Sequence, residues 1–384
     1  MSFVDTPTDS EYEDRLEYPF HSDPYGSDND SVYSVELEDL DIDALQDEVS
    51  VLFGQPCIDI SKLNEGGFHK IYNLLMMDGS EYIARIALPS YERYKTESEV
   101  ATMKYIEQHT TIPVPKIIHY DSTSHNSVGA EYIIMSKVQG VRLCDVWNKM
   151  STAQQKDVLS QYIDIVLQLK SLEFPQIGSL YYNERYKSFE IGEAIEMSWF
   201  LDERAIISDV HRGPFNSTYD YLQSAIQKES IYVKDYGSKS DQQHDLHDLD
   251  ALSRIVTSLT QSQSYPSSET FVLCHGDLHS SNIMVHGSTI TAVIDWECSG
   301  AYPLDNLCNY PIWLNDDAKT TSEQSISNNH MRDFFKAEME SRCPEFIDII
   351  ERDSSLRLKD VYHCLFAAFW DRERVHDVVR CLLH

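Results

Sequence analysis

One short segment constrains the fold of this chain more than any other feature of its sequence. Within residues 271–297 an apolar strand enters a polar loop, a hairpin leaves that loop, and an acidic residue follows the hairpin. Because a hairpin returns the chain toward its starting point, Asp277 and Asn282 in the loop are predicted to lie close to Asp295 beyond the hairpin. The pattern therefore gathers three oxygen-bearing side chains in one compact unit.

These residue types are the ones that phosphoryl transfer requires. A carboxylate accepts the proton of the attacking hydroxyl group, and oxygen ligands hold Mg²⁺ between the phosphates. Four residues separate Asp277 from Asn282, and Asp295 stands 13 residues after Asn282, so one unit supplies all three parts. Asp and Asn also cap turns. Turn capping alone is disfavoured here because the three residues occur together with His275 and Gly276 in one pattern.

Upstream, residues 57–137 are predicted to form a unit of five strands and one helix. The strands are expected at 58–63, 71–76, 82–86, 116–120 and 131–138, and the helix at 96–108. An Asp78-Gly79 pair between two apolar runs is a strong hairpin signal. Pro113 and Pro115 end the helical pattern.

The remainder of the chain, residues 138–384, reads as mainly helical. Amphipathic patterns predict helices at 152–172, 195–201, 219–226, 327–342 and 358–382. The polar stretch 236–270 is predicted to be a solvated loop. Its run from His244 to Asp248 carries residue types that bind metals, but the loop interpretation is favoured.

Charge is unevenly distributed along the chain. The net charge is −32, and residues 1–50 hold 16 acidic residues against a single basic one. Residues 1–34 are predicted to be a disordered acidic leader, and residues 35–56 a short helical lead-in. Neutralising phosphates requires clustered basic residues, so this balance argues against nucleic acid as a partner. The acidic leader is instead compatible with a protein partner.

The sequence indicates a cytoplasmic location. The leader has neither a signal-peptide pattern nor the Arg-rich pattern of a mitochondrial presequence. The sequence holds no run of about 18 consecutive apolar residues, so no membrane span is expected. Eight cysteines are scattered without a CxxC pair, which favours reduced thiols.

In its most informative segment the chain resembles one family, the aminoglycoside phosphotransferase and choline kinase-like group. The matching motifs are His275-Gly276-Asp277-Leu278-His279-x-x-Asn282-Ile283, Ile294-Asp295-Trp296-Glu297, Glu65-Gly66-Gly67-Phe68, Ala84-Arg85-Ile86 and Ser98-Glu99-Val100-Ala101-Thr102-Met103. The likeness covers residues 57–305. Within the family, the chain is similar to fungal members, including a subgroup named for altered inheritance of mitochondria. A mitochondrial association rests on that name alone.

The resemblance implies an α+β, protein-kinase-like bilobal fold with ATP- and Mg²⁺-dependent kinase activity. An N-lobe of antiparallel sheet plus helix would span residues 57–137, and a mainly helical C-lobe residues 138–384. The C-lobe would hold a catalytic loop at 275–282 and a metal motif at 294–297. The γ-phosphoryl group of ATP would pass to a hydroxyl group of a small molecule.

The resemblance also implies roles for individual residues. Asp277 would be the catalytic base, and His275 would brace its loop. Asn282 and Asp295 would hold Mg²⁺. The expected nucleotide contacts are Arg85 on the phosphates with Glu99 as its partner, the covering loop Gly66, Gly67 and Phe68, and the adenine-binding backbone at Ser136 and Val138. Arg85 replaces the lysine of better-known kinases, and the two side chains are not interchangeable.

Two other interpretations remain open. His275, Asp277 and His279 alternate like metal ligands, which would suit a metallohydrolase, although no further cluster completes such a site. A kinase-like nucleotide-binding scaffold with weak or no catalytic activity is the second. Motifs for Walker NTPases, Rossmann enzymes and serine hydrolases are absent from the sequence.

No motif identifies the acceptor. Selection among acceptors would fall to the C-lobe. Its acidic positions include Asp202, Glu203, Asp316 and Asp317. These residues are compatible with a cationic amino alcohol or amino sugar as the acceptor, and surface solubility explains them equally well.

Overall fold

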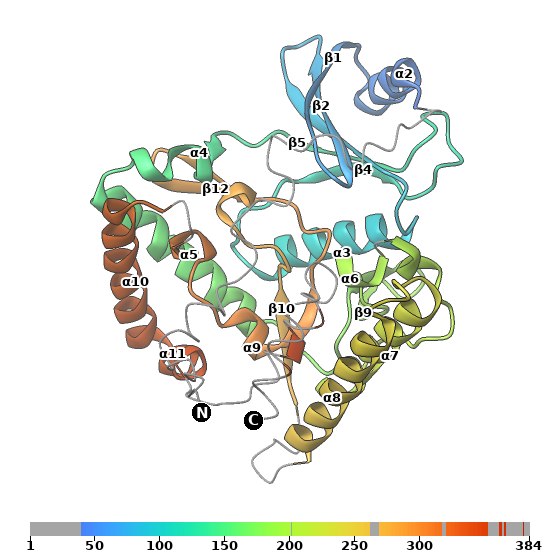
Figure 1. Ribbon diagram of the computed structural model, residues 1–384. Coiled ribbons are helices and arrows are strands. Elements are labelled where there is room, and N and C mark those ends of the chain that lie inside the picture. The colour runs from blue at the N-terminus through green and yellow to red at the C-terminus, as the bar shows by residue number, and fades with distance from the viewer. Residues whose placement is uncertain are drawn as a thin grey trace, which may run out of the picture.

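The computed structural model of the chain describes residues 40–200, 202–261, 269–316 and 320–351, together with Val361, Tyr362, Leu365 and Val379. The acidic leader and most of the helix expected at 358–382 lie outside the described residues. An antiparallel sheet with two helices forms one end of the molecule, and a larger, mainly helical part forms the other (Figure 1). We refer to the part from α2 to β5 as the N-lobe and to the part from β6 onward as the C-lobe.

Five antiparallel strands form the N-lobe sheet in the order β1-β2-β3-β5-β4. They are β1 (Cys57–Glu65), β2 (His69–Met76), β3 (Glu81–Ala87), β4 (Ile117–Asp121) and β5 (Tyr132–Ser136). All five predicted strands are confirmed, with ends that shift by at most two residues. The helix predicted between the third and fourth strands is α3 (Tyr94–His109).

The two faces of this sheet pack against different helices because side chains alternate along a strand. In β5, Ile134 lies in one apolar cluster with Leu45 of α2 (Ile42–Phe53). The neighbouring Ile133 points the other way, into a cluster with Val100 of α3. Figure 1 shows α2 and α3 on opposite sides of the sheet. Helix α2 forms within the lead-in that the sequence predicts at 35–56.

The main core of the C-lobe surrounds the long helix α5 (Thr152–Ser171), which begins with a capping box of Ser151 and Gln154. Strand β10 (Phe271–Cys274) lies between β7 (Glu173–Phe174) and β13 (Gly300–Pro303). The predicted hairpin is confirmed as β11 (Ile283–His286) and β12 (Thr289–Val293), and β6 (Val141–Arg142) pairs with β11. Strand β10 therefore leads into the predicted catalytic loop, and the hairpin leads from that loop to Asp295.

Shorter elements complete the C-lobe. They are α4 (Leu143–Val146), β8 (Leu180–Asn183), β9 (Ser188–Ile191), α6 (Met197–Phe200), α9 (Leu304–Leu307) and the 3₁₀ turns Trp147–Lys149, Asp202–Ile206, Ser280–Asn282 and Ile312–Leu314. Two helices at the far edge are α10 (Ser322–Arg342), which includes the helix predicted at 327–342, and α11 (Pro344–Ile350).

The prediction of a solvated loop at 236–270 is wrong over most of its length. Residues 242–260 form the helix α8 (Gln242–Thr260), which packs beside α7 (Thr218–Asp235) (Figure 1). The reason is a narrow apolar stripe at helical spacing, from Leu249 through Leu252 to Ile255, which is buried against the core. Most of the polar residues around this stripe are exposed or partly exposed, although Asp248 is buried, and this polar composition concealed the stripe. Helix α7 is likewise longer than the predicted 219–226.

Three further properties hold for the part of the chain that the structure describes. No helix in it is long and apolar enough to cross a membrane. Its six cysteines form no disulfide bond. It contains no group of three or more His, Cys, Asp or Glu side chains arranged to hold a metal ion, and the run from His244 to Asp248 belongs to α8.

Candidate active site

The predicted catalytic loop starts with a backbone turn that only glycine accommodates. Gly276 has φ +83°, and a Cβ atom at this position would lie 2.3 Å from the carbonyl oxygen of Cys298. A side chain is excluded by both the left-handed conformation and the contact. Gly276 therefore lets the chain leave β10 directly against the segment that follows Asp295.

His275 connects the two halves of the site. Its Nε2 donates to the carbonyl oxygen of Ile294 at 2.9 Å, and its Nδ1 accepts from the backbone N–H of Asp277 at 3.3 Å. The ring also contacts Trp296, with centroids 4.3 Å apart. Burial lowers the pKa of His275. A neutral ring with its proton on Nε2 satisfies both hydrogen bonds, as expected for a residue that braces the loop.

Asn282 lies against Asp277. Its Nδ2 donates to the backbone carbonyl of Asp277 at 3.0 Å and to the Oδ2 atom at 3.1 Å. The N–H of Ile294 donates to the carbonyl of Asn282 at 2.9 Å, which ties the loop to the strand before Asp295. Because the amide donors of Asn282 face Asp277, its Oδ1 atom is the one left to face a cation.

His279 also contacts the Asp277 carboxylate. Its Nε2 lies 3.2 Å from Oδ2 of Asp277, whose side chain is 29% exposed. Sequence reasoning considered His279 only as a metal ligand and missed this contact. Its position two residues after Asp277 in the loop was the available signal. The Asp277 carboxylate is thus held by two neighbours while part of it stays accessible.

Arg85 brings the N-lobe into the site. In β3 its neighbours Ala84 and Ile86 face α2, so Arg85 faces α3. There its Nε lies 3.2 Å from Oε1 of Glu99, which establishes the expected pair, although without hydrogen-bond alignment. Its Nη2 lies 2.5 Å from Oδ1 of Asp295. Arg85 therefore joins the N-lobe helix to the acid that follows the hairpin.

These contacts shift the ionisation of the acids. Burial opposes the charge of Asp295, but the adjacent Arg85 outweighs it and holds the pKa of Asp295 below its ordinary value. Glu99 is almost fully buried, and burial raises its pKa to about 7 despite Arg85. Asp295 also has φ +68°, a left-handed conformation that is uncommon for residues other than glycine. Asp295 therefore loses its proton more readily than Glu99.

Three further residues complete a buried group of charges that sequence reasoning missed. Lys95 lies 3.0 Å from Oε2 of Glu297, and Nδ1 of His69 lies 3.3 Å from the same oxygen. Nη2 of Arg85 lies 3.6 Å from the other oxygen of Glu297. A signal for Lys95 existed, because Lys95 and Glu99 are one helical turn apart and so share a face of α3. We call His69, Arg85, Lys95, Glu99, Asp295 and Glu297 the interlobe cluster.

The Gly66-Gly67 loop is a tight turn between β1 and β2. The N–H of Gly66 donates to the carbonyl of His69 at 2.9 Å. The ring of Phe68 reaches across to the C-lobe, where it contacts Phe200 with centroids 5.5 Å apart. It also lies 5.0 Å from the Lys95 ammonium group. Phe68 thus packs beside the interlobe cluster, with the glycines before it.

Ser136 ends β5, and its main-chain donor is already used. Its N–H donates to the carbonyl of Lys116 at 2.9 Å, and its hydroxyl oxygen accepts from the N–H of Lys116 at 2.8 Å. A donor to adenine would therefore come from the residues after Ser136. Val138 is the predicted residue in that position, and it follows the strand.

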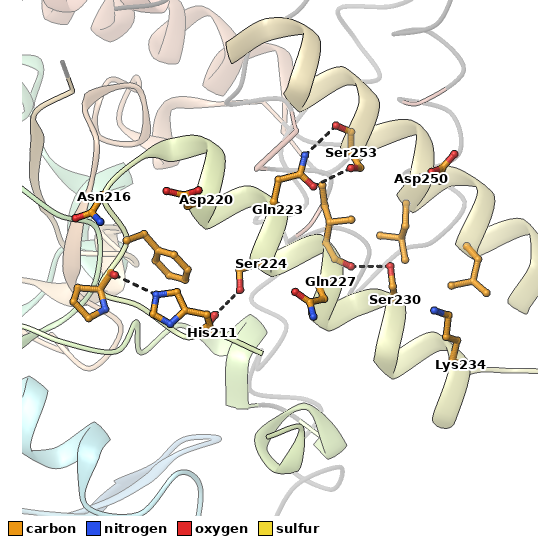
Figure 2. Close-up of a pocket in the computed structure, with 15 residues that line it drawn as sticks. His211, Asn216, Asp220, Gln223, Ser224, Gln227, Ser230, Lys234, Asp250 and Ser253 are labelled. Atoms are coloured by element: carbon orange, nitrogen blue, oxygen red, sulfur yellow. Dashed lines mark hydrogen bonds between the residues drawn. The ribbon is translucent and has the colours of Figure 1, made fainter. Parts of the chain in front are cut away.

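A groove of about 710 Å³ lies between α7 and α8, away from these residues. Figure 2 shows that its polar side chains engage one another: Gln223 pairs with Ser253, and Ser224 donates to the carbonyl of His211. None of the predicted site residues lines it. The groove is therefore separate from the predicted phosphoryl-transfer residues.

Comparisons with known proteins agree with this geometry. The sequence profile of the phosphotransferase enzyme family matches residues 65–305, more than half of the chain. A subtelomeric hrmA-associated cluster protein of Aspergillus fumigatus is 28% identical over 325 residues, covering 70% of this chain and 63% of that protein. An altered inheritance of mitochondria protein 9 of Debaryomyces hansenii is 29% identical over 136 residues, covering 33% and 22% of the two chains. The chain thus spans less than two thirds of the length of these relatives.

A solved structure establishes the fold class. It is a thermostable mutant of aminoglycoside phosphotransferase APH(4)-Ia in a ternary complex with AMP-PNP and hygromycin B. The TM-score is 0.53 at 15% identity, over 88% of this chain and 98% of that one. At this identity the likeness concerns the fold alone. The α+β, kinase-like bilobal fold expected from the sequence is therefore confirmed.

Proposed function

Because this chain belongs to the phosphotransferase enzyme family, we propose that it is a kinase that transfers the γ-phosphoryl group of ATP to a hydroxyl group of a small molecule. One observation carries the proposal. Asn282 donates to the side chain of Asp277, its carbonyl accepts from the N–H of Ile294 directly before Asp295, and Arg85 reaches Asp295 from the N-lobe. The proposed base, the proposed Mg²⁺ ligands and the proposed phosphate-binding cation are thus connected by one network of contacts.

In this proposal Asp277 orients the acceptor hydroxyl and takes its proton. The carboxylate is accessible, and Asn282 and His279 limit its rotation from one side. Phosphoryl transfer has little covalent chemistry for the protein to perform, so most of the rate enhancement comes from positioning and from neutralised charge. A base held in place on a short loop suits that task.

The donor set at the far end of the loop fits Mg²⁺. The Asp295 carboxylate and the free Oδ1 of Asn282 are oxygen ligands of the kind that this ion prefers. When bound there, Mg²⁺ would neutralise charge on the β- and γ-phosphates. Asp295 now pairs with Arg85, so it would have to release the guanidinium group before it could serve as a ligand.

Arg85 is the candidate phosphate-binding cation. Its guanidinium group donates in a planar fork that suits phosphate oxygens. On nucleotide binding it would exchange Asp295 for phosphate while Glu99 keeps its Nε side in place. The remaining nucleotide contacts of the proposal are the Gly66-Gly67 turn with Phe68, and the backbone around Val138.

Both alternatives have weaker support. A metallohydrolase needs His275 as a ligand, and both ring nitrogens of His275 are already used in hydrogen bonds. A scaffold without activity does not require Asp277, Asn282 and Asp295 together. Retention of the full set favours the enzyme.

The acceptor of this proposal is a small-molecule alcohol. Asp316, one of the acids that could favour a cationic acceptor, accepts hydrogen bonds from Ser325 and Asn328 of α10. Asp316 therefore stabilises α10 and does not support a cationic acceptor. The proposal places the reaction in the cytoplasm, as the sequence indicates, whereas several relatives carry a mitochondrial name.

The test is a screen for ATP- and Mg²⁺-dependent phosphorylation of metabolite extracts by the purified chain, followed by mass spectrometry. A product that gains one phosphoryl group with the wild type and is absent with Asp277→Ala supports the proposal. ATP binding without any product across fungal extracts would favour the scaffold, and near-normal transfer by Asp277→Ala would reject the mechanism.

A further inference from the structure

A second buried cation stands beside Arg85. Lys95 lies in the first turn of α3, and its side chain is only 2% exposed. Neither the family match nor the relatives assign it a role. Burying an ammonium group is unfavourable unless a partner compensates it, so the partner that the fold supplies is informative.

That partner is Glu297, from the segment that follows Asp295. Oε2 of Glu297 lies 3.0 Å from Nζ of Lys95, and its side chain is 10% exposed. The two residues are 202 positions apart and belong to different lobes. The pair thus spans the lobe junction beside the contact of Arg85 with Asp295.

Glu297 and Asp295 share a neighbour. Nη2 of Arg85 lies 2.5 Å from Asp295 and 3.6 Å from Glu297. If Lys95 did not balance Glu297, the buried carboxylate would have Arg85 as its nearest cation, because burial keeps the adjacent His69 neutral by lowering its pKa. Arg85 would then be drawn toward Glu297 and away from the place where the proposed phosphates sit.

We infer that Lys95 and Glu297 are positioning residues of the nucleotide site, which keep the guanidinium group of Arg85 aimed at Asp295 and the phosphates. The inference rests on the proposed function and adds two residues to it. Lys95 satisfies Glu297, so Arg85 stays shared between Glu99 and Asp295. The pair of Lys95 with Glu297 also keeps α3 attached to residues 294–297 while Arg85 exchanges Asp295 for phosphate.

The chain offers a matched control for this inference. Lys228 lies 3.0 Å from Glu229, with side chains that are 2% and 3% exposed. The distance equals that of the pair of Lys95 with Glu297, and the burial of the lysine is the same. Lys228 belongs to α7 and contacts none of the interlobe cluster in the interactions that the described residues show. Lys228→Met should therefore reproduce the loss of a buried pair without touching the nucleotide site.

The experiment measures ATP affinity by calorimetry in the presence of Mg²⁺, together with KM and kcat, for wild type, Lys95→Met, Glu297→Gln, the double variant and Lys228→Met. Each is studied well below its own Tm. We expect Lys95→Met to weaken ATP binding about tenfold or more, because the unbalanced Glu297 then draws Arg85 aside. Glu297→Gln should weaken it to a similar degree for the other reason given above, because α3 then loses its attachment to the segment after Asp295. The double variant should lose little beyond either single change, because the two residues act as one unit. Lys228→Met should keep wild-type affinity.

A structural role alone gives a different pattern. Lys95→Met would then lower the Tm as Lys228→Met does, with ATP affinity within about twofold of wild type, and that result overturns the inference. Glu297→Gln is nearly isosteric and keeps the test decisive if Lys95→Met does not fold. If wild type itself neither binds nor consumes ATP, the proposed function fails. If wild type transfers phosphate while the Lys95 and Glu297 variants bind ATP normally, only this inference fails.

Discussion

Two clusters of charged side chains in this molecule contain similar residue types but differ in their hydrogen bonding. The interlobe cluster sets the acids Glu99, Asp295 and Glu297 against Arg85 and Lys95. The second cluster, Arg204, Lys228 and Glu229 near α7, sets one acid against two bases. We call the second one the α7 cluster.

The α7 cluster is fully bonded. Arg204 donates to both carboxylate oxygens of Glu229, at 2.8 and 2.7 Å, and Lys228 donates to the carbonyl of Ser198. In the interlobe cluster, Nε of Arg85 and Oε2 of Glu99 are buried without a hydrogen bond. Buried polar groups in native proteins are normally satisfied. The difference teaches that the α7 cluster is satisfied within the fold, whereas the interlobe cluster keeps buried polar atoms without hydrogen bonds, which is compatible with the nucleotide site that we propose there.

The largest expected effect belongs to the α7 cluster. Glu229→Gln leaves two buried cations without a carboxylate, which should lower the free energy of unfolding by about 3–5 kcal/mol. Urea denaturation measures this loss. ATP affinity of the folded variant should match wild type, and a weakened affinity would break the distinction between the clusters.

Asp295→Asn should have the opposite signature. Removing this charge leaves Arg85 with Glu99 and Glu297, so the fold should persist, but a proposed Mg²⁺ ligand is lost. We expect kcat to fall by about 10²–10³, the usual cost of removing one charge-stabilising group. Steady-state kinetics and a Tm measurement separate the two effects. A variant that unfolds but keeps full specific activity in its folded fraction would contradict the assignment.

One acid of each cluster, Glu99 and Glu229, should also respond oppositely to pH. Burial raises the pKa of Glu99 from 4.5 to about 7, so the unfolded chain releases this proton first and the contribution of Glu99 to stability falls as pH rises through that window. Burial opposes the charge of Glu229, but Lys228 and Arg204 outweigh it and lower its pKa. Its stabilisation is therefore present above pH 4.5 and lost below. The groups that face Glu99 are His69 on β2, Arg85 on β3, Lys95 on α3, and Asp295 and Glu297 after β12.

Stability curves of Glu99→Gln and Glu229→Gln against wild type measure this contrast. Relative to wild type, Glu99→Gln should gain stability as pH rises from 4.5 to about 7. The deficit of Glu229→Gln should shrink below pH 4.5. Parallel curves for the two variants would remove the electrostatic difference between the clusters.

The smallest effect sharpens the role of burial. Lys170 and Glu345 also lie 3.0 Å apart, but their side chains are 25% and 62% exposed. Lys170→Met should change the free energy of unfolding by less than about 1 kcal/mol, because exposed pairs contribute little. The same substitution at the buried Lys228 should cost several times more. Equal losses at the two lysines would show that pair distance, rather than burial, sets the energy.

Much of the fold could be predicted from the sequence because its signals are local. Alternating apolar residues and the Asp78-Gly79 turn predict the N-lobe strands, and the hairpin after Asn282 follows from its Gly287-Ser288 turn. Helix α8 was missed for a physical reason. Its polar composition hides a stripe as narrow as Leu249, Leu252 and Ile255, and tertiary packing against α7 and the core stabilises the helix.

The sequence by itself determined the proximity of Asp277, Asn282 and Asp295, since a loop and a hairpin suffice to bring them together. Only the tertiary structure decided which cation meets which acid. Arg85 lies 210 residues before Asp295, and Lys95 lies 202 before Glu297. No local spacing encodes such pairs. They form because packing of α3 against the C-lobe removes these charges from water, and a buried charge is tolerated only where an opposite one meets it.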